Sequence, residues 1–272
     1  MPDLLRADNV VFGYQRTPIL RDVSAGIPAG GFLGILGPNG SGKTTLLRVL
    51  AGTVQPARGR VLLDGRDLNS VPRRALARRM AVVPQETHLA FDYTVLEVVM
   101  MGRYPHLATF EVEGPRDFAI AREALAATGT DTLVDRPFGT LSGGEKQRVI
   151  VAAALAQIAA AEGDGILLLD EPTVALDLAY QLELGRLLRD LQRRVPIAIA
   201  VSTHDLNFAA SLCRTLVLLK NGSVLAAGST DEVLTADNIR SLYDVDAEVS
   251  RHAATGRIVV VPIRRVAAEG RQ

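Results

Sequence analysis

The stretch Gly37-Pro38-Asn39-Gly40-Ser41-Gly42-Lys43-Thr44-Thr45 follows the pattern G-x-x-x-x-G-K-[ST]. An apolar run, 31–36, precedes it and predicts a β-strand, and the apolar spacing of 44–51 predicts an α-helix. Glycines let successive backbone N–H groups turn inward around phosphate oxygens, and the start of a helix adds positive potential. In this context we predict a phosphate-binding loop (P-loop) rather than a glycine-rich turn with no ligand. Lys43 would hold the β- and γ-phosphates, and Thr44 would give its hydroxyl to Mg²⁺.

On both sides of this loop, apolar runs alternate with helical patterns. Two continuous apolar runs, 166–169 and 197–201, predict central parallel strands covered by helices on both faces. Between them and the P-loop, residues 94–160 have mostly helical spacing. Lys220-Asn221-Gly222 is a tight-turn signal between two strand-like runs and predicts a β-hairpin. The fold class is therefore α/β with a helical insertion, followed by a short tail after about residue 249.

The composition excludes several classes of protein. The chain has 272 residues, with 30 Lys and Arg against 30 Asp and Glu, so it lacks the basic excess of a nucleic-acid binder. Its one cysteine, Cys213, cannot form an internal disulfide, which indicates a reducing compartment and a buried inert thiol. The first thirty residues lack a secretory pattern, and the longest near-apolar run, 149–161, is shorter than the about 20 residues of a membrane span. We expect a soluble, cytosolic chain.

A strand that ends in two acids adds to the P-loop chemistry. The apolar run 166–169 leads directly into Asp170 and Glu171. An aspartate at the carboxyl end of a buried strand beside a P-loop is placed to orient a Mg²⁺ shell. Glu171 would then reach a water in line with the γ-phosphorus. The alternative is a strand followed by a solvated acidic turn.

A second anion cradle is predicted at Ser142-Gly143-Gly144, where a helix begins that runs through 155. A hydroxyl, exposed backbone N–H groups and the helix dipole all favour an anion there. Taken alone, Ser142 could be a helix N-cap, with Glu145 completing a capping box. The chain thus has two anion cradles, of which only one is a P-loop. This suggests that the second cradle serves the nucleotide of a partner subunit.

Leu141-Ser142-Gly143-Gly144-Glu145-Lys146-Gln147-Arg148 resembles the signature of ATP-binding cassette (ABC) ATPases, and the resemblance covers residues 4 to about 235. Further residues match the family's motifs in order: Tyr14 (stacking on adenine), Gln85 (Q-loop), Asp177 (D-loop, with Ala175 and Leu176) and His204 (switch histidine, contacting the γ-phosphate). Val174 stands where the family commonly has serine. Singly, Tyr14 could be a strand aromatic, Gln85 a surface turn residue and His204 a helix-entry residue capped by Asp205.

The resemblance implies a P-loop NTPase (RecA-like) core with an antiparallel β subdomain and an inserted α-helical subdomain. The expected ATPase domain is 1–248, with its core at about 1–88 and 161–248 and the helical subdomain at about 89–160; 249–272 is a tail. Lys43, Gln85, Glu171 and His204 would be catalytic, and Thr44, Gln85 and Asp170 would hold Mg²⁺. The expected ATP contacts are Tyr14, Gly37, Pro38, Asn39, Gly40, Ser41, Gly42, Lys43, Thr44, Thr45, Ser142, Gly143, Gly144 and Asp177. Two copies would form a head-to-tail dimer around ATP.

The segment Gly102-Arg103-Tyr104-Pro105-His106 resembles that of importers of ferric siderophores, haem and cobalamin. This implies a metal-chelate importer, in which the chain is peripheral on the cytoplasmic face of the inner or plasma membrane. Its partners would be integral-membrane permease subunits and, indirectly, a substrate-binding protein. Met100 and Met101 suit a partner helix or, more simply, a core.

Three alternatives stay open. They are a soluble ABC ATPase of iron–sulfur cluster assembly, the ATPase of an ABC exporter, and a catalytically silent regulatory module. His88, His106 and His252 lack ligand spacing, so no metal site is expected beyond Mg²⁺ held with ATP. Arg73, Arg74, Arg78 and Arg79 predict a solvated basic helix face, which could lie near anionic headgroups.

Overall fold

The computed structural model describes residues 3–15, 17–87, 89–159, 161, 163–174 and 177–266. The chain divides into two compact units. The central unit is Asn69–Ile199, and the terminal unit combines Pro2–Leu68 with Ala200–Gln272. Ala175 and Leu176 of the predicted D-loop, and His88, lie outside the described residues.

In the described residues, the terminal unit contains three sheets. The first is antiparallel with the order β2-β1-β4-β5, and the second has the order β10-β9-β3-β8, in which β3 and β9 are parallel. The third pairs β11 with β12 antiparallel. The strands are β1 (Asp3–Tyr14), β2 (Thr17–Pro28), β3 (Phe32–Leu36), β4 (Arg58–Leu63), β5 (Arg66–Asp67), β8 (Ile197–Thr203, which belongs to this unit from Ala200 on), β9 (Thr215–Lys220), β10 (Ser223–Ser229), β11 (Val245–Arg251) and β12 (Ile258–Arg265). The helices are α1 (Lys43–Leu50), α7 (Leu206–Leu212), α8 (Thr230–Val233) and α9 (Ala236–Tyr243).

Burial explains the second sheet of this unit. Every residue of β3 and of β8 is buried, which is the pattern of strands covered on both faces. The predicted hairpin after residue 219 is confirmed, because β9 and β10 pair antiparallel around it. Asn221 and Gly222 both have positive φ, 51° and 79°, as a two-residue turn matching the twist of the strands requires.

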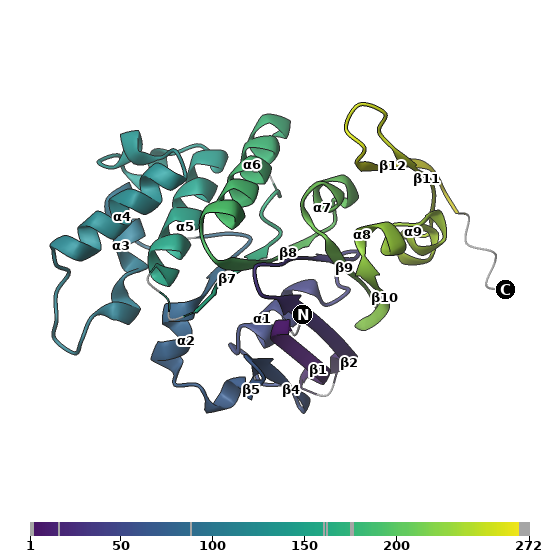
Figure 1. The fold of residues 1–272 in the computed structure, drawn as a ribbon, viewed down its shortest axis with the longest axis horizontal. Helices are drawn as coiled ribbons and strands as arrows, with labels where there is room; N and C mark the ends of the chain where they lie inside the picture. Colours follow the sequence, from purple (N-terminus) through teal and green to yellow (C-terminus); the bar gives the residue numbers. More distant parts are fainter. Residues whose placement is uncertain are drawn as a thin grey trace. The chain divides into compact units, whose positions relative to one another are not determined.

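The central unit is mainly helical, and the helical prediction for 94–160 is confirmed. Its elements are α2 (Arg73–Arg79), β6 (Met80–Val83), α3 (Val95–Met101), α4 (Pro115–Ala127), α5 (Gly143–Ile158), β7 (Gly165–Asp170) and α6 (Leu178–Arg194). Within this unit, α3, α4 and α5 lie side by side and share a core that includes Val99, Leu125 and Ala152 (Figure 1). Strands β6 and β7 pair parallel, which places their carboxyl ends at one edge.

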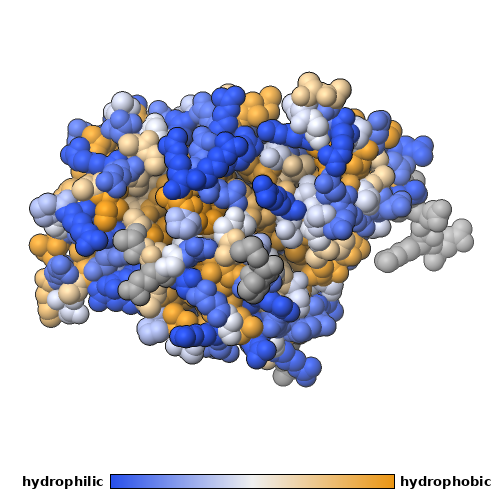
Figure 2. Space-filling view, viewed as in Figure 1, coloured by the Kyte–Doolittle hydropathy of each residue, from blue (hydrophilic) through white to orange (hydrophobic). Residues whose placement is uncertain are grey.

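In the described residues, no helix is both long and apolar enough to cross a membrane. The face shown in Figure 2 is a mixture of hydrophilic and hydrophobic residues. Cys213 is buried, as expected, and its burial raises the pKa of the thiol.

Candidate nucleotide site

The P-loop connects β3 to α1, as predicted. The backbone geometry and the close packing of this loop explain why it contains glycines. Gly40 and Gly42 have φ of 78° and 106°, a region that favours glycine. A side chain at residue 37 would place its Cβ 2.3 Å from the carbonyl oxygen of Leu219. The loop is therefore formed by backbone, and it packs against the β9–β10 turn, where the Gly222 N–H donates to the Ser41 carbonyl.

Two side chains give the P-loop its chemistry. Lys43 is buried, and its Nζ donates to the carbonyl oxygens of Gly37 (2.8 Å) and Pro38 (3.3 Å). Ser41 is 3% exposed, and its Oγ has no hydrogen-bond partner among the residues that the structure describes. A buried hydroxyl that lacks an acceptor is unusual. A glycine-lined loop with a cation and such a hydroxyl fits a phosphate oxygen.

Tyr14 ends β1 in the same unit as the P-loop. Its ring packs edge-to-face on Phe12, with centroids 5.0 Å apart, and 47% of the residue is exposed. Its hydroxyl accepts a hydrogen bond from Arg48 of α1 (3.1 Å). The aromatic is thus fixed at two points while much of it stays exposed, as a stacking platform needs.

His204 follows β8 in the terminal unit and is exposed. The carboxylate of Asp205 caps α7, accepting from the N–H groups of Asn207 and Phe208, both at 2.9 Å. The Asp205 N–H donates to Thr203 Oγ1 (3.1 Å). The helix-cap interpretation of Asp205 is therefore correct. It leaves the imidazole of His204 outside the helix.

Asp170 and Glu171 lie at the end of β7 in the central unit. They are 8% and 6% exposed, so the alternative of a solvated acidic turn is wrong. Glu171 has a φ of 47°, which is uncommon for a long side chain and costs about 1 kcal/mol. A buried carboxylate in a strained backbone conformation makes Glu171 a candidate functional residue.

Ser142 begins α5 and forms the capping box with Glu145. Its Oγ accepts from the Glu145 N–H (3.3 Å), and its N–H and Oγ both donate to Glu145 Oε2 (2.8 Å each). These bonds hold the pKa of Glu145 below its usual value. Gly144 has no room for a side chain, because its Cβ would lie 2.3 Å from the Tyr180 ring. The cap and the glycines leave the first N–H groups of the helix for an anion.

The other predicted residues of the central unit lie on loops and helix ends. Gln85 is exposed directly after β6. Asp177 caps α6, where its carboxylate accepts from the Tyr180 N–H (3.0 Å), a structural role that sequence reasoning missed. Val174 is 37% exposed. The terminal unit thus holds the P-loop, Tyr14 and His204, and the central unit holds the rest.

Comparison with known proteins identifies the family. The family described as "ABC transporter" matches residues 20–174. The chain belongs to the ABC transporter family. It is 44% identical over 247 residues to a hemin import ATP-binding protein of Gloeobacter violaceus, covering 90% of this chain and 89% of that protein. It is 42% identical over 247 residues to a cobalamin import ATP-binding protein of Halobacterium salinarum, covering 91% of this chain but 60% of that protein.

The structural comparison agrees. A solved ABC transporter described as of the metal-chelate type, in an inward-facing conformation, matches with a TM-score of 0.83 at 30% identity, covering 97% of this chain and 98% of that chain. The mixed α/β architecture is that of ABC ATPase cassettes, as the P-loop NTPase prediction required.

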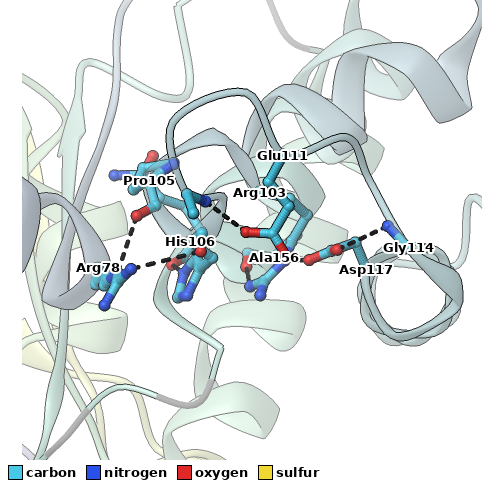
Figure 3. Close-up of polar contacts among 10 residues, drawn as sticks. Arg78, Arg103, Pro105, His106, Glu111, Gly114, Asp117 and Ala156 are labelled. Atoms are coloured by element: carbon cyan, nitrogen blue, oxygen red, sulfur yellow. Dashed lines mark hydrogen bonds and ion pairs between the residues drawn. The ribbon is translucent and has the colours of Figure 1, made fainter.

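In this ABC protein, the segment after α3, residues 103–106, makes hydrogen bonds and an ion pair to several other elements (Figure 3). Arg103 is 3% exposed; its Nε pairs with Asp117 Oδ1 (3.0 Å), and its guanidinium also donates to the Ala156 carbonyl (2.6 Å). Burial opposes ionisation of Asp117, but a hydrogen bond from the Gly114 N–H and the contact with Arg103 outweigh it and hold the pKa of Asp117 below its usual value. Together they tie the end of α3 to α4 and α5.

The same segment also binds α2, whose basic face is exposed at Arg73, Arg74 and Arg78, as predicted. The Nε atoms of Arg74 and Arg78 both donate to the Pro105 carbonyl (2.8 Å each), and Arg79 donates to the Asp164 carbonyl (3.2 Å). These bonds join residues far apart in the chain, which charge patterning does not reveal. Met100 is 7% exposed and belongs to the core, in agreement with the simpler interpretation.

Replacing Arg103 with alanine is expected to lower the free energy of unfolding by about 3 kcal/mol, because it leaves the partly buried Asp117 carboxylate without its cation. Urea denaturation measures this. Arg116→Ala, at an exposed arginine of the same helix as Asp117, is the control and should change stability by no more than about 0.5 kcal/mol. Equal effects of the two variants would show that the buried Arg103–Asp117 ion pair contributes no more to stability than an exposed arginine.

His106 gives a pH dependence. Partial burial, followed by Arg103 and Arg78, lowers the pKa of His106 below 6.5, although its Nε2–H donates to the Gln157 carbonyl (2.7 Å). The unfolded chain therefore binds the proton more readily, so stability falls as the pH drops below about 6.5. Between pH 7 and pH 5, wild type should lose more stability than His106→Gln. Identical pH slopes would contradict this.

Proposed function

We propose that this chain is the ATP-hydrolysing subunit of a transporter, that two copies dimerise on ATP, and that it powers a membrane permease importing a metal chelate. The observation that carries the ATPase proposal is the P-loop, where a backbone cradle is lined by the buried Lys43 and by a Ser41 hydroxyl with no hydrogen-bond partner in the described part of the chain. The buried, strained carboxylate of Glu171 supports it.

The proposed roles follow from these environments. Lys43 binds the β- and γ-phosphates, and Tyr14 stacks on the adenine. Glu171 polarises the attacking water, and His204 contacts the γ-phosphate. Thr44, Gln85 and Asp170 are the residues assigned to Mg²⁺, which would supply charge neutralisation at the phosphates. The described residues contain no cluster of three or more His, Cys, Asp or Glu that could hold another metal.

The dimer follows from the second cradle. Ser142, Gly143 and Gly144 would contact the ATP that is held by the P-loop of the other copy, with Asp177 near the same interface. The γ-phosphate then touches both cradles, so its removal weakens the dimer. We keep the division into 1–248, with its helical subdomain at about 89–160, and a tail at 249–272 as part of this proposal.

The cargo assignment rests on the relatives, whose names give hemin and cobalamin import. The chain spans 60% of the length of the cobalamin import protein, so cargo, permease and substrate-binding protein are proposals. We propose that the transported substrate is a metal chelate, namely haem, cobalamin or a ferric siderophore. The subunit would act as a peripheral protein on the cytoplasmic face of the membrane.

Affinity purification from membranes tests the transport role. Tagged Glu171→Gln protein with ATP is recovered from detergent-solubilised membranes, and the co-purifying proteins are identified by mass spectrometry. Tagged Lys43→Ala, which should bind ATP much more weakly, is the matched control. Recovery of a polytopic permease whose gene lies next to a gene for a chelate-binding protein supports the importer. Recovery of an exporter permease, or of a soluble iron–sulfur assembly protein without any permease, would overturn it.

A further inference from the structure

The C-terminal hairpin of the terminal unit follows all the residues that are assigned to the nucleotide. Strands β11 and β12 pair antiparallel and pack on α9 and α7 (Figure 1). Ala247 of β11, Val260 of β12 and Ile239 of α9 form a small buried core of their own. The hairpin is therefore folded and packs at a defined position. The elements that it packs on include α7, the helix that follows His204.

Asn207, in the first turn of α7, makes the polar contact with this hairpin. Its Nδ2 donates to the Val260 carbonyl (3.1 Å), and the Val260 N–H donates to its Oδ1 (2.9 Å). Both polar atoms of one amide thus engage the backbone of a residue 53 positions away that is 2% exposed. The Asn207 N–H is meanwhile bound by the Asp205 cap, two residues earlier.

A second contact reaches the histidine itself. The hydroxyl of Tyr243, at the end of α9, donates to the His204 carbonyl (3.4 Å). Tyr243 is partly buried against the same small core as the hairpin. Helix α7 has only seven residues, Leu206–Leu212, too few to be stable without tertiary contacts. Its starting position is therefore set by the Asp205 cap, the Asn207 amide and Tyr243.

We propose that the β11–β12 hairpin is a positioning element for His204, acting through Asn207 and supported by Tyr243. The proposal rests on the proposed contact of His204 with the γ-phosphate. The hairpin fixes the first turn of α7 and, through the adjoining cap, the backbone at residue 204. Any partner that moved the hairpin would then alter the rate of hydrolysis without touching the nucleotide.

Steady-state ATPase assays of full-length variants test this. Asn207→Ala, which removes both hydrogen bonds to Val260, is expected to lower kcat about fivefold and to leave the KM for ATP unchanged. Asn238→Ala is the matched control, because Asn238 also donates to a backbone carbonyl, that of Val233 (2.8 Å), but sits outside the contact with α7. An unchanged kcat in Asn207→Ala, or an equal fall in both variants, would overturn the proposal.

A double-mutant cycle separates this inference from the role of His204. If Asn207 acts through His204, Asn207→Ala should cause no further loss in a His204→Ala background, measured by release of radiolabelled phosphate. If His204→Ala keeps full activity, the assigned role of His204 is wrong. If His204→Ala is slow but Asn207→Ala lowers the rate by the same factor in both backgrounds, His204 keeps its role and the positioning proposal fails.

A spectroscopic readout covers the case in which Asn207→Ala is unstable. The chain has only four histidines, so the His204 ring resonances can be assigned by comparison with His204→Gln. Tyr243→Phe removes a single hydroxyl, and it should shift the His204 resonances while leaving those of His106 in place. Unchanged His204 resonances in Tyr243→Phe would contradict the proposal.

Discussion

Replacing Glu171 with glutamine is expected to leave ATP binding intact and to slow hydrolysis by about 10²–10⁴-fold, the usual contribution of a general base. Glutamine has the same shape, so the buried position at the end of β7 and its strained backbone should tolerate it. What is lost is the negative charge that polarises the attacking water. Steady-state phosphate release measures the rate, and calorimetry measures the ATP affinity.

The control for this variant is Glu183→Gln, which neutralises a half-exposed carboxylate of α6 that pairs with Arg148. It should hydrolyse ATP at a rate close to wild type, because exposed ion pairs contribute little. Near-normal turnover in Glu171→Gln would show that Glu171 is not the base.

Replacing Lys43 with alanine is expected to weaken ATP binding by about 100-fold. The Lys43 ammonium is buried in the P-loop, where low solvent access makes a charge contact with phosphate strong. Removing it also leaves the Gly37 carbonyl without the donor it has at 2.8 Å. Calorimetry with ATP measures the affinity, and circular dichroism checks that the fold is retained.

Lys220→Ala is the comparison for this second variant. Lys220 also bonds a backbone carbonyl, that of Ser241, and pairs with Asp244 in the same unit, but it is not part of the P-loop. Its loss should leave the ATP affinity unchanged. Unchanged binding in Lys43→Ala would refute the assignment of the P-loop.

Local sequence patterns predicted the parts of the fold that depend on neighbours in the chain. The P-loop between β3 and α1 and the turn at Asn221-Gly222 were found because glycine spacing and backbone sign are local properties. The strand β2, Thr17–Pro28, was missed. Its alternation is interrupted by a register shift near Asp22, which has a φ of 55°, and its identity comes from pairing with β1.

Contacts between distant residues were beyond the sequence patterns. The bonds of Arg74 and Arg78 to Pro105, the buried pair of Arg103 with Asp117, and the amide of Asn207 on Val260 all join separate elements. None leaves a local signal, because each needs the tertiary fold to bring its members together. The candidate site residues were proposed from motifs, whereas the strain at Glu171 and the cap formed by Asp177 became visible only in the folded structure.

The proposed ATP-driven dimer is tested most directly by the mass of Glu171→Gln in solution. Sedimentation with saturating ATP should give twice the mass of one 29.1 kDa chain, and with ADP the mass of one. Ser142→Asp, added to the same protein, should bind ATP normally but stay a single chain, because its carboxylate would repel the γ-phosphate of the other copy. A single-chain mass for Glu171→Gln with ATP bound would contradict the proposed dimer. So would a dimer that still forms when Ser142→Asp is added.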